Sequence, residues 1–584
     1  MYIIGLNAYH GDSSACLIHN GQLLAAVEEE RFRRIKHWAG FPSKSIEYCL
    51  AEANISLEQI DYIAINSDSK ANILKKIVYT LKNKPNLSFI LDRVKNRQQR
   101  ADISGELKEA FHDATFSGEI IPVEHHLAHL ASAHTVSPFE ESIVLSVDGF
   151  GDFSSAAWGI GSGSKITIDN RVFFPHSLGI FYSALTQFIG FPHYGDEYKV
   201  MGLAPYGKPT YLTQLRDVVK LSADGTFKLN LRYFCHHKAG VEYEWEGGSP
   251  IVGQLFTNEL EKLLGFPVRL KDEPLEDCHW DLAHSIQAMY EEAFFNILDA
   301  AHKKYKIDTL TLAGGCAMNS VANGKVYRQS PFKKMYIQSA AGDAGGAIGA
   351  AFTVWHDTLK NEKRNFVMNH AYLGPEYSND EIKSVLDSRN SDIKSANCQI
   401  EKIANEETLC QQTAIAISEG KVIGWFQGRM EWGPRALGNR SIVCDPRRAD
   451  MKDILNLKIK RRESFRPFAP SILRESVLEW FEEEDDVPFM MQVFQIREEK
   501  RNEIPAVTHN DGSGRLQTVH KDTNPRYYKL IECFKDLSGV PIVLNTSFNE
   551  NEPVVCTPEE ALNCFLRTKM DILVLGDWFI KRNE

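Results

Sequence analysis

A turn motif that occurs twice is the feature that most constrains the fold of this chain. The first copy is Gly11-Asp12-Ser13-Ser14-Ala15, and the second is Gly151-Asp152-Phe153-Ser154-Ser155-Ala156. An apolar run precedes each turn and small or apolar residues follow it, which predicts a strand-turn-strand unit in both places. Short Gly/Asp/Ser turns also arise by chance, but two units with apolar flanks favour a duplicated α/β domain.

Strand-like and helix-like segments alternate along the first part of the chain. Strands are predicted at residues 3–6, 15–18, 23–27, 62–65, 143–147 and 154–160, and a helix at 44–53. Gly-rich turns follow further strand-like runs at 309–312 and 335–337, and the second turn leads into a small-residue helix beginning at 347–351. Such turns suit phosphate binding, but close packing of strand and helix also uses glycine.

A polar, charged stretch between His356 and Asn369, followed by Gly374-Pro375, predicts a domain boundary. We therefore expect one domain at residues 1–362 and a second at 370–584. The second part alternates again, with a predicted helix at 408–418 and predicted strands at 422–426 and 540–544.

Composition excludes several classes of protein. The chain has 584 residues, 43% of them hydrophobic and 24% charged, which is typical of an ordinary folded protein rather than a disordered or fibrous one. Its net charge of −11 provides no overall attraction for nucleic acid or an anionic membrane. No apolar run is long enough to span a bilayer and the start has no leader pattern, so we expect a cytoplasmic protein. The 11 cysteines are scattered without a CxxC pair, which predicts reduced packing residues.

Two histidines, His125 and His129, have the spacing that places them on one face of a helix, one turn apart. There they can share a metal ion, although pairs at this spacing are also common by chance. A carboxylate would complete a site suited to iron, zinc or manganese. Asp343, in its Gly-rich turn, and Asp148, before the second repeat, are the candidates, but an aspartate in a turn often only bonds its own loop.

Residues 429–466 are strongly basic, with eleven Lys or Arg against five Asp or Glu. Arg435 follows Gly433-Pro434 and Arg466 precedes Pro467, so both lie at rigid turns where a guanidinium can be fixed on a phosphate. This pattern predicts a polyphosphate site. A solvated basic helix over 452–462 explains several of the other charges, and nucleic acid is disfavoured because interleaved aromatics are lacking.

Further motifs follow in order through the chain. They are Ile4-Gly5-Leu6-Asn7, Glu28-Glu29-Glu30-Arg31-Phe32, Met201-Gly202-Leu203-Ala204-Pro205-Tyr206-Gly207, Gly314-Gly315-Cys316-Ala317-Met318-Asn319, Trp432-Gly433-Pro434-Arg435-Ala436-Leu437-Gly438, Phe465-Arg466-Pro467-Phe468-Ala469-Pro470 and Asn545-Thr546-Ser547-Phe548-Asn549. Together with His125-xxx-His129, they resemble the O-carbamoyltransferase family of nodulation-factor, tobramycin and cephamycin carbamoyltransferases. The resemblance covers essentially the whole chain.

This resemblance implies an α/β fold with a duplicated actin-like ATPase-fold N-terminal domain and a YrdC-like α/β C-terminal domain. It implies that the second domain makes carbamoyl adenylate from carbamoyl phosphate and ATP, with Mg²⁺ as a candidate partner of ATP. The residues that would hold the phosphates and the carbamoyl group there are Arg435, Lys460, Arg466, Arg515, Asn545 and Ser547.

The resemblance further implies that the first domain transfers the carbamoyl group to an acceptor hydroxyl. His125, His129 and Asp343 would bind a metal, Fe²⁺ in known relatives or another divalent ion, with Asp148 beside the metal and the acceptor. The residues that would contact nucleotide are Lys36, Gly315 and Asn319. Many relatives have His directly before the Asp of the first turn, whereas this chain has His10-Gly11-Asp12, so His10, Asp12 and Asp148 all stay candidates for catalysis.

The function predicted is ATP-dependent O-carbamoylation of a sugar or other polyhydroxylated small molecule in biosynthesis, without a nucleic-acid or membrane partner. The motifs do not specify the acceptor or the oligomeric state. Carbamoyl transfer to a protein or tRNA, and a nucleotide-dependent scaffold without turnover, are the alternatives. The hydrogenase-maturation enzymes that act on protein add an acylphosphatase-like region and CxxC zinc motifs, which this sequence lacks.

Overall fold

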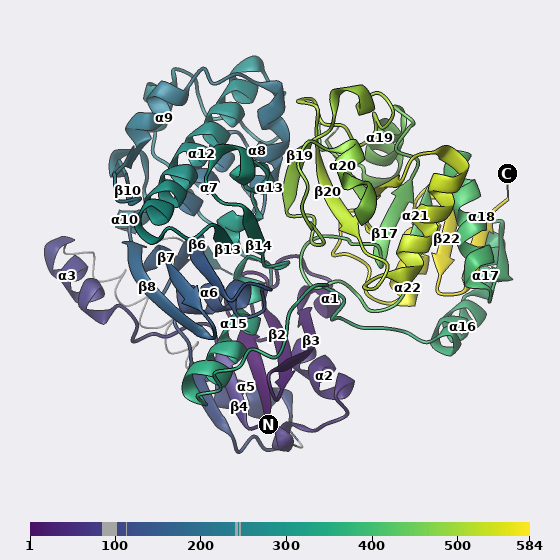
Figure 1. Ribbon diagram of the computed structural model, residues 1–584, viewed down its shortest axis with the longest axis horizontal. Coiled ribbons are helices and arrows are strands. Elements are labelled where there is room, and N and C mark those ends of the chain that lie inside the picture. Colours follow the sequence, from purple (N-terminus) through teal and green to yellow (C-terminus); the bar gives the residue numbers. More distant parts are fainter. Residues whose placement is uncertain (84–101, 113, 240–242, 245–246, 464, 584) are drawn as a thin grey trace. The chain divides into compact units, whose positions relative to one another are not determined.

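The computed structural model describes residues 1–83, 102–112, 114–239, 243–244, 247–463 and 465–583. The chain divides into two compact units, unit 1 (Met1–Met368) and unit 2 (Asn369–Glu584). Figure 1 shows both units, each with sheets flanked by helices. Among the helices of the described ranges, none is both long and apolar enough to cross a membrane. All eleven cysteines are free thiols and most are buried, as their scattered positions predict.

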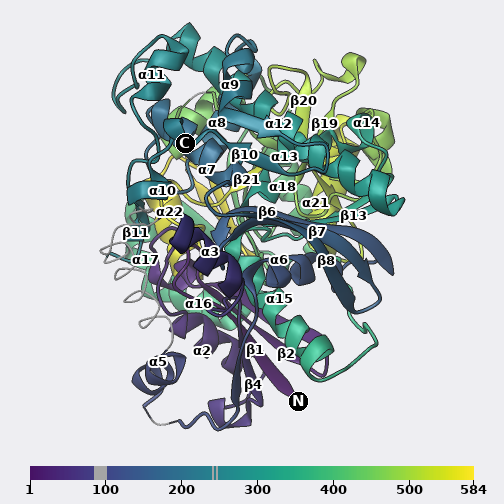
Figure 2. The same ribbon diagram turned by 90° about the vertical axis from the view of Figure 1, so that its left-hand side faces the viewer.

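Unit 1 contains two five-stranded sheets of the same topology (Figure 2). The first, in order β3-β2-β1-β4-β5, consists of β1 (Tyr2–Asn7), β2 (Ser14–His19), β3 (Gln22–Glu28), β4 (Tyr62–Ile65) and β5 (Glu119–Pro122). The second, in order β8-β7-β6-β13-β14, consists of β6 (Glu141–Gly151), β7 (Ser154–Ser162), β8 (Lys165–Phe173), β13 (Thr309–Ala313) and β14 (Lys334–Ile337).

Strand directions repeat as well. In each sheet the first three strands of the chain are antiparallel neighbours, and the fourth and fifth run parallel to the first. The repeated turn joins the first two strands in both copies, and Asp12 (φ +58°) and Asp152 (φ +46°) both adopt the left-handed conformation. The duplication predicted from the sequence is therefore present in the fold.

Two helices lie between these sheets. Helix α6 (His125–His134) packs on β6 and β13, and α15 (Gly346–Thr353) packs on β1, β2 and α6. The small residues of α15 allow this close approach, because a Cβ on Gly349 would lie 1.7 Å from the Ala128 carbonyl oxygen. The crossing brings the start of α6 close to the turn that leads into α15.

The other elements of unit 1 surround these layers. They are α1 (Glu30–Arg33), α2 (Ser43–Glu52), α3 (Ile73–Asn83), α5 (Ile103–Ala110), α7 (Leu178–Phe188), α8 (Glu197–Leu203), α9 (Leu212–Val218), β9 (Val219–Leu221), β10 (Phe227–Leu229), α10 (His236–Ala239), β11 (Tyr243–Glu244), β12 (Ile251–Val252), α11 (Glu259–Leu264), α12 (Asp277–Tyr305), α13 (Ser320–Gly324) and α14 (Val326–Gln329). Helix α2 covers β2 and β3 with its apolar face, where Ile46 and Leu50 are buried.

Unit 2 is built on a mixed nine-stranded sheet in the order β15-β23-β22-β16-β17-β21-β18-β20-β19. Its strands are β15 (Cys398–Lys402), β16 (Ile423–Phe426), β17 (Arg440–Cys444), β18 (Ala469–Leu473), β19 (Gln492–Gln495), β20 (Ser513–Val519), β21 (Ile542–Ser547), β22 (Ile572–Leu575) and β23 (Trp578–Arg582). Its helices are α16 (Asn379–Ser388), α17 (Asn390–Ser395), α18 (Glu406–Ser418), α19 (Met451–Asp453), α20 (Val477–Trp480), α21 (Pro525–Ser538) and α22 (Pro558–Arg567). Both units thus have the predicted α/β class.

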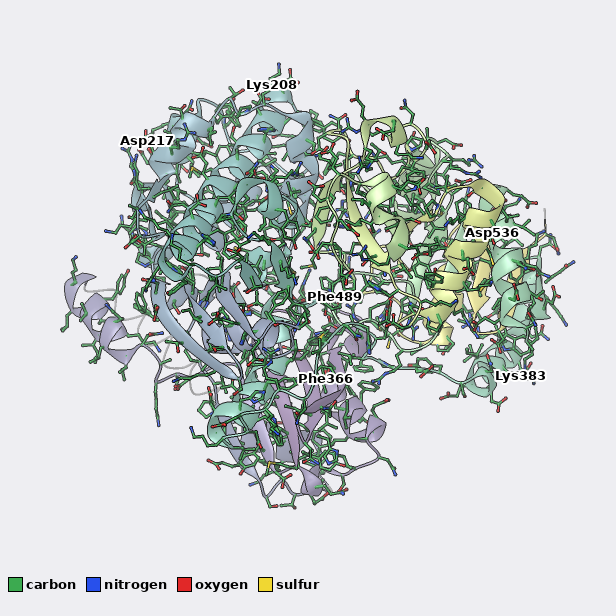
Figure 3. The ribbon with its side chains drawn as sticks, in the orientation of Figure 1. Lys208, Asp217, Phe366, Lys383, Phe489 and Asp536 are labelled. Atoms are coloured by element: carbon green, nitrogen blue, oxygen red, sulfur yellow. The ribbon has the colours of Figure 1, made fainter. Side chains whose placement is uncertain are left out.

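Among the side chains labelled in Figure 3, Lys208 and Asp217 of unit 1 and Lys383 and Asp536 of unit 2 are exposed at the outer edges of their units, as charged residues usually are. The central strands are buried along nearly their whole length: β1 exposes only part of Tyr2, and β22 is buried throughout. This explains their continuous apolar sequences, because strands covered on both faces do not alternate polar and apolar residues.

Candidate functional site

Four side chains of unit 1 converge in the layer between the two sheets: His125, His129, Asp148 and Asp343. Each offers one possible ligand atom, and these atoms all lie within 4.8 Å of one another. We call this group the His/Asp cluster. The Nε2 atoms of both histidines lie 3.0 Å from Asp148 Oδ2, and 3.5 and 3.4 Å from Asp343 Oδ1.

Local structure explains how the histidines reach this position. Helix α6 begins at His125 because the Glu124 side chain caps it, accepting the Leu127 backbone N–H. Asp152 of the second repeat then accepts the N–H of His125 at 2.9 Å and that of Asp68 at 2.8 Å. The first two turns of α6 are thereby fixed, with both imidazoles on the face predicted from their spacing.

Several features of the cluster fit a divalent cation. The two histidine Nε2 atoms, which face the carboxylates of Asp148 and Asp343, lie only 3.1 Å apart. Burial and the neighbouring Asp148 charge raise the pKa of Asp343, because two buried carboxylates so close together repel each other when both are ionised. A cation among two imidazole nitrogens and two carboxylate oxygens would relieve this repulsion, and iron, zinc and manganese suit such ligands.

The family resemblance implies a position beside the metal for Asp148, whereas in the structure its carboxylate is a member of the His/Asp cluster. Burial opposes its ionisation, but hydrogen bonds from His125 and His129 hold its pKa well below the ordinary value. Its Oδ1 accepts the backbone N–H groups of Gly149 at 2.8 Å and Gly315 at 3.1 Å. Both carboxylate oxygens are therefore occupied by partners within the protein.

The residues predicted to contact nucleotide have different surroundings. The Gly315 N–H is bonded to Asp148, and the Asn319 side chain caps α13 and exchanges hydrogen bonds with Gln287. Lys36 is exposed in the loop after α1. The structure thus brings Gly315 to the His/Asp cluster, whereas the Asn319 side chain supports the fold around it.

His10 and Asp12 both belong to the turn between β1 and β2. His10 Nδ1 lies 3.8 Å from Asp343 Oδ2, and its ring centroid lies 5.6 Å from that of His125. The Asp12 carboxylate instead pairs with His37, a residue that the sequence reasoning missed although it follows the predicted Lys36.

In unit 2, the loop that carries Arg435 is held rigidly from several sides. One oxygen of the buried Glu431 carboxylate accepts three backbone N–H groups, those of Leu437, Asn439 and Arg440, at 2.8–3.0 Å. Asn545 donates to the Ala436 carbonyl oxygen and Gln517 to that of Leu437. These contacts fix the chain directly after Arg435, so its guanidinium has a defined position.

Removal of the Glu431 carboxylate provides a stability prediction. In Glu431→Ala, three buried N–H groups lose their acceptor, at a cost of about 1–3 kcal/mol for each group that water cannot reach. We expect the free energy of unfolding of unit 2 to fall by about 3 kcal/mol or more. Urea denaturation followed by tryptophan fluorescence measures this change. Glu419→Ala, at an exposed position, is the control and should change stability little; an equal loss in both variants would contradict the assignment.

Arg435 and Arg515 are cations to which the described residues offer no counter-charge. Burial lowers the pKa of Arg435 to about 10, and burial plus repulsion from Arg435 and Arg462 lowers that of Arg515 far below its usual range. In the part of the chain that the structure describes, no carboxylate pairs with either guanidinium, and both Nε atoms are buried without a hydrogen-bond partner. We call these two residues the arginine pair. An anion is the ligand that such a pair lacks.

The other predicted residues of unit 2 are already engaged. Lys460 is buried and its ammonium donates to Ser547 and Asn549, so it is not part of a solvated helix as the sequence pattern allowed. Arg466 forms an ion pair with Glu463 at 2.8 Å. The Asn545 Nδ2 donates to three oxygens, whereas its Oδ1 is buried and has no partner among the described residues.

Sequence reasoning missed two further groups near the arginine pair. Arg462 stacks on the ring of Phe468 with 4.8 Å to the centroid, and His509 lies beside Arg515 and Lys452. Burial and these cations lower the pKa of His509 to about 4, so its imidazole is neutral. His509 belongs to none of the motifs described above, so no sequence signal pointed to it.

Comparison with known proteins identifies the family. The profile "Carbamoyltransferase N-terminus" matches residues 2–352 and "Carbamoyltransferase C-terminus" matches residues 414–582, so the chain belongs to the carbamoyltransferase family. The family assignment makes it an enzyme of the carbamoyltransferase class.

Individual relatives support this assignment. "Uncharacterized protein sll1178" of Synechocystis is 41% identical, covering 100% of this chain and 97% of that protein. "Nodulation protein NolNO" of Sinorhizobium fredii is 38% identical over 99% of this chain and 80% of its own length. A "3'-hydroxymethylcephem-O-carbamoyltransferase" of Amycolatopsis lactamdurans is 31% identical over 47% of this chain and 49% of its own length.

Proposed function

We propose that this carbamoyltransferase is an ATP-dependent O-carbamoyltransferase that works in two half-reactions. Unit 2, as a YrdC-like domain, forms carbamoyl adenylate from carbamoyl phosphate and ATP. Unit 1, as a duplicated actin-like domain, transfers the carbamoyl group to a hydroxyl of a sugar or other polyhydroxylated small molecule. The observation that carries the proposal is the arginine pair, because two half-buried guanidiniums that no carboxylate of the described residues pairs with favour a polyanionic substrate.

In the first half-reaction, carbamoyl phosphate loses its phosphate to water and leaves carbamate. A carbamate oxygen then attacks the α-phosphate of ATP, the bond to the β-phosphate breaks, and pyrophosphate leaves. Fixed cations offset the charge that gathers on the leaving group. Arg435 and Arg515 provide the positive charges. Glu431 and Gln517 hold the loop that follows Arg435, so that it need not reorganise during the reaction.

Lys460 and Asn545 complete the proposed site from the side of β21. Lys460 places a positive charge at the end of this strand, against Ser547. The buried Asn545 Oδ1 is an acceptor without a partner among the described residues, and it is suited to an N–H of the carbamoyl group. Arg466 is paired with Glu463 in this structure, so in the proposed site it binds a phosphate after the phosphate has displaced the Glu463 carboxylate.

In the second half-reaction, the acceptor oxygen attacks the carbamoyl carbon and AMP leaves. When a divalent cation, proposed to be Fe²⁺, is bound by His125, His129 and Asp343 with Asp148, it supplies Lewis-acid polarisation at this step. The chain's own contribution is the placement of these side chains: α6 and the turn before α15 are locked together, so the cluster is preorganised.

The first test is pyrophosphate release from ATP, with and without carbamoyl phosphate, and with no acceptor added. We expect release to depend strictly on carbamoyl phosphate, because ATP alone lacks the attacking carbamate. Pyrophosphate is quantified by a coupled phosphatase assay on protein purified with iron present. Release without carbamoyl phosphate, or none from folded protein under either condition, would overturn the proposed first half-reaction. A positive result justifies a screen of sugars as acceptors.

A further inference from the structure

A second group of titratable side chains in unit 1 lies outside the His/Asp cluster: Asp12, Glu30 and His37, whose possible ligand atoms lie within 4.8 Å of one another. His37 Nδ1 lies 2.8 Å from Asp12 Oδ1, and the His37 backbone N–H donates to Glu30 Oε2 at 2.8 Å. Arg31 pairs with Glu30 at 2.7 Å. Because a cation, Arg31, already neutralises Glu30, these contacts describe an ion pair of Asp12 with His37 rather than a metal site.

The turn that carries Asp12 is bonded to the turn that carries Asp343. Asn7 Nδ2 donates to the carbonyl oxygens of Gly11 and Asp12, at 3.1 and 2.9 Å. Asn66 Nδ2 in turn donates to Asn7 Oδ1 and to the Asp343 carbonyl oxygen, at 3.2 and 3.3 Å. The backbone of the turn that carries Asp12 is therefore tied to the turn that carries Asp343 by a short chain of amide hydrogen bonds.

The imidazole of His37 is held in place by packing. The ring of Tyr194 contacts it edge-on, with 5.3 Å between the centroids. A Cβ on Gly195, whose φ is +82°, would lie 2.5 Å from His37 Nε2, so this position is restricted to glycine. The Asp12 and His37 side chains still expose 26% and 32% of their surface, which leaves the pair accessible to a substrate.

Electrostatics keep both members of the pair charged at neutral pH. Although burial opposes it, Asp12 and then Glu30 raise the pKa of His37 to about 9, against a smaller opposing effect of Lys36. Burial likewise opposes ionisation of Asp12, but His37 and Arg31 lower its pKa. The His37 charge also interacts with Glu197 of α8, where it opposes the rise in the Glu197 pKa that burial causes.

The three candidate bases now differ in what they can do. Asp148 uses both oxygens within the His/Asp cluster, and His10 lies against Asp343. Asp12 binds His37 through Oδ1, whereas its Oδ2 accepts no hydrogen bond from any residue that the structure describes. Asp12 alone combines a negative charge with a carboxylate oxygen available to a substrate hydroxyl.

We propose that Asp12 takes the proton of the acceptor hydroxyl in the transfer step, and that His37 is the positioning residue that orients its carboxylate. This inference rests on the proposed function. The acceptor oxygen forms a bond to the carbamoyl carbon, the bond from that carbon to the phosphate oxygen of AMP breaks, and AMP leaves with the electron pair. The hydroxyl proton passes to Asp12 Oδ2 and then to solvent.

The test separates the two half-reactions by rapid-quench kinetics. Enzyme is mixed with ATP and carbamoyl phosphate; water is the hydroxyl donor in one series, and methyl β-D-glucopyranoside is added in a second. A burst of pyrophosphate reports adenylate formation, and the slower formation of AMP reports transfer. In Asp12→Asn we expect an unchanged burst and AMP formation slowed about 100-fold or more.

His37 is tested by two substitutions and a pH profile. His37→Gln retains a donor to Asp12 and should slow AMP formation about 10-fold, whereas His37→Leu, without a donor, should approach Asp12→Asn. In the unmodified protein the transfer rate should fall above about pH 9, where His37 loses its proton, and His37→Gln should lack this fall. In His37→Gln the acidic limb of the pH–rate profile should move to higher pH, because the loss of a cationic neighbour raises the pKa of Asp12.

Separate outcomes bear on the two proposals. Loss of the pyrophosphate burst in the unmodified protein counts against the proposed function. A normal burst with AMP formation unaffected by Asp12→Asn overturns the base assignment. Equal rates in His37→Gln and His37→Leu, together with an unchanged pH profile, overturn the positioning role. Thermal melts on each variant show whether folding is retained.

Discussion

Replacing Arg515 by methionine is expected to slow pyrophosphate release about 10³-fold, in line with the worth of an arginine that stabilises phosphoryl transfer. Methionine keeps an unbranched apolar stem but removes the guanidinium that is proposed to bind the triphosphate. The substituted protein should nevertheless be at least as stable as the original, because the change also removes repulsion between Arg515, Arg435 and Arg462. Initial rates with saturating ATP and carbamoyl phosphate measure the effect.

A binding experiment distinguishes this role from indirect damage. Pyrophosphate alone should raise the melting temperature of the unmodified protein, since a ligand that binds only the folded state stabilises it. It should raise that of Arg515→Met much less. Arg448→Met is the matched control, because it removes an arginine of the same unit that is ion-paired with Asp450 at the surface. A normal rate and a normal ligand shift in Arg515→Met would contradict the proposed phosphate site.

Removing one ligand of the His/Asp cluster should have an effect of similar size on the other half-reaction. In His129→Asn and Asp343→Asn we expect bound divalent metal to fall from about one ion per chain to near zero. AMP formation should slow about 10³-fold, which corresponds to several kcal/mol of lost stabilisation. The pyrophosphate burst should survive, because the arginine pair is untouched. Elemental analysis of protein purified with iron measures the metal independently of activity.

His126→Asn is the control for this experiment. His126 neighbours both proposed ligands on α6 but is directed to Ser146, with 2.9 Å between Nδ1 and Oγ. Burial lowers its pKa to about 3, so it is a neutral core residue. This variant should keep its metal and its transfer rate. Full metal content in His129→Asn, or loss of metal in His126→Asn, would contradict the proposed ligand set.

Much of this arrangement could be predicted from the sequence because the signals are local. The helical spacing of His125 and His129 and the rigid turn around Arg435 depend on a few consecutive residues, and both appear where they were expected. The repeated turns likewise predicted the duplicated sheets. Motif order, read as a resemblance, linked these segments to carbamoyl transfer, and the family matches confirm the class.

What the sequence could not provide was the partner of each polar group. Asn319 and Asn545 belong to motifs, yet their amides bond mainly within the protein. His37 had no motif signal of its own, because its link to Asp12 depends on how the loop after α1 folds back onto the first turn. Such pairings arise from tertiary packing between segments distant in the chain, which periodicity and spacing do not encode.

The two copies of the repeated turn have acquired different duties. Asp152 accepts the N–H groups of Asp68 and His125, whereas Asp12, in the same left-handed backbone conformation, binds His37 and leaves 26% of its side chain exposed. The same substitution in the two turns should therefore have different effects. The second copy positions the start of α6 through the His125 N–H, whereas the first carries the proposed base, so loss of the aspartate should weaken the fold in one copy and the transfer step in the other.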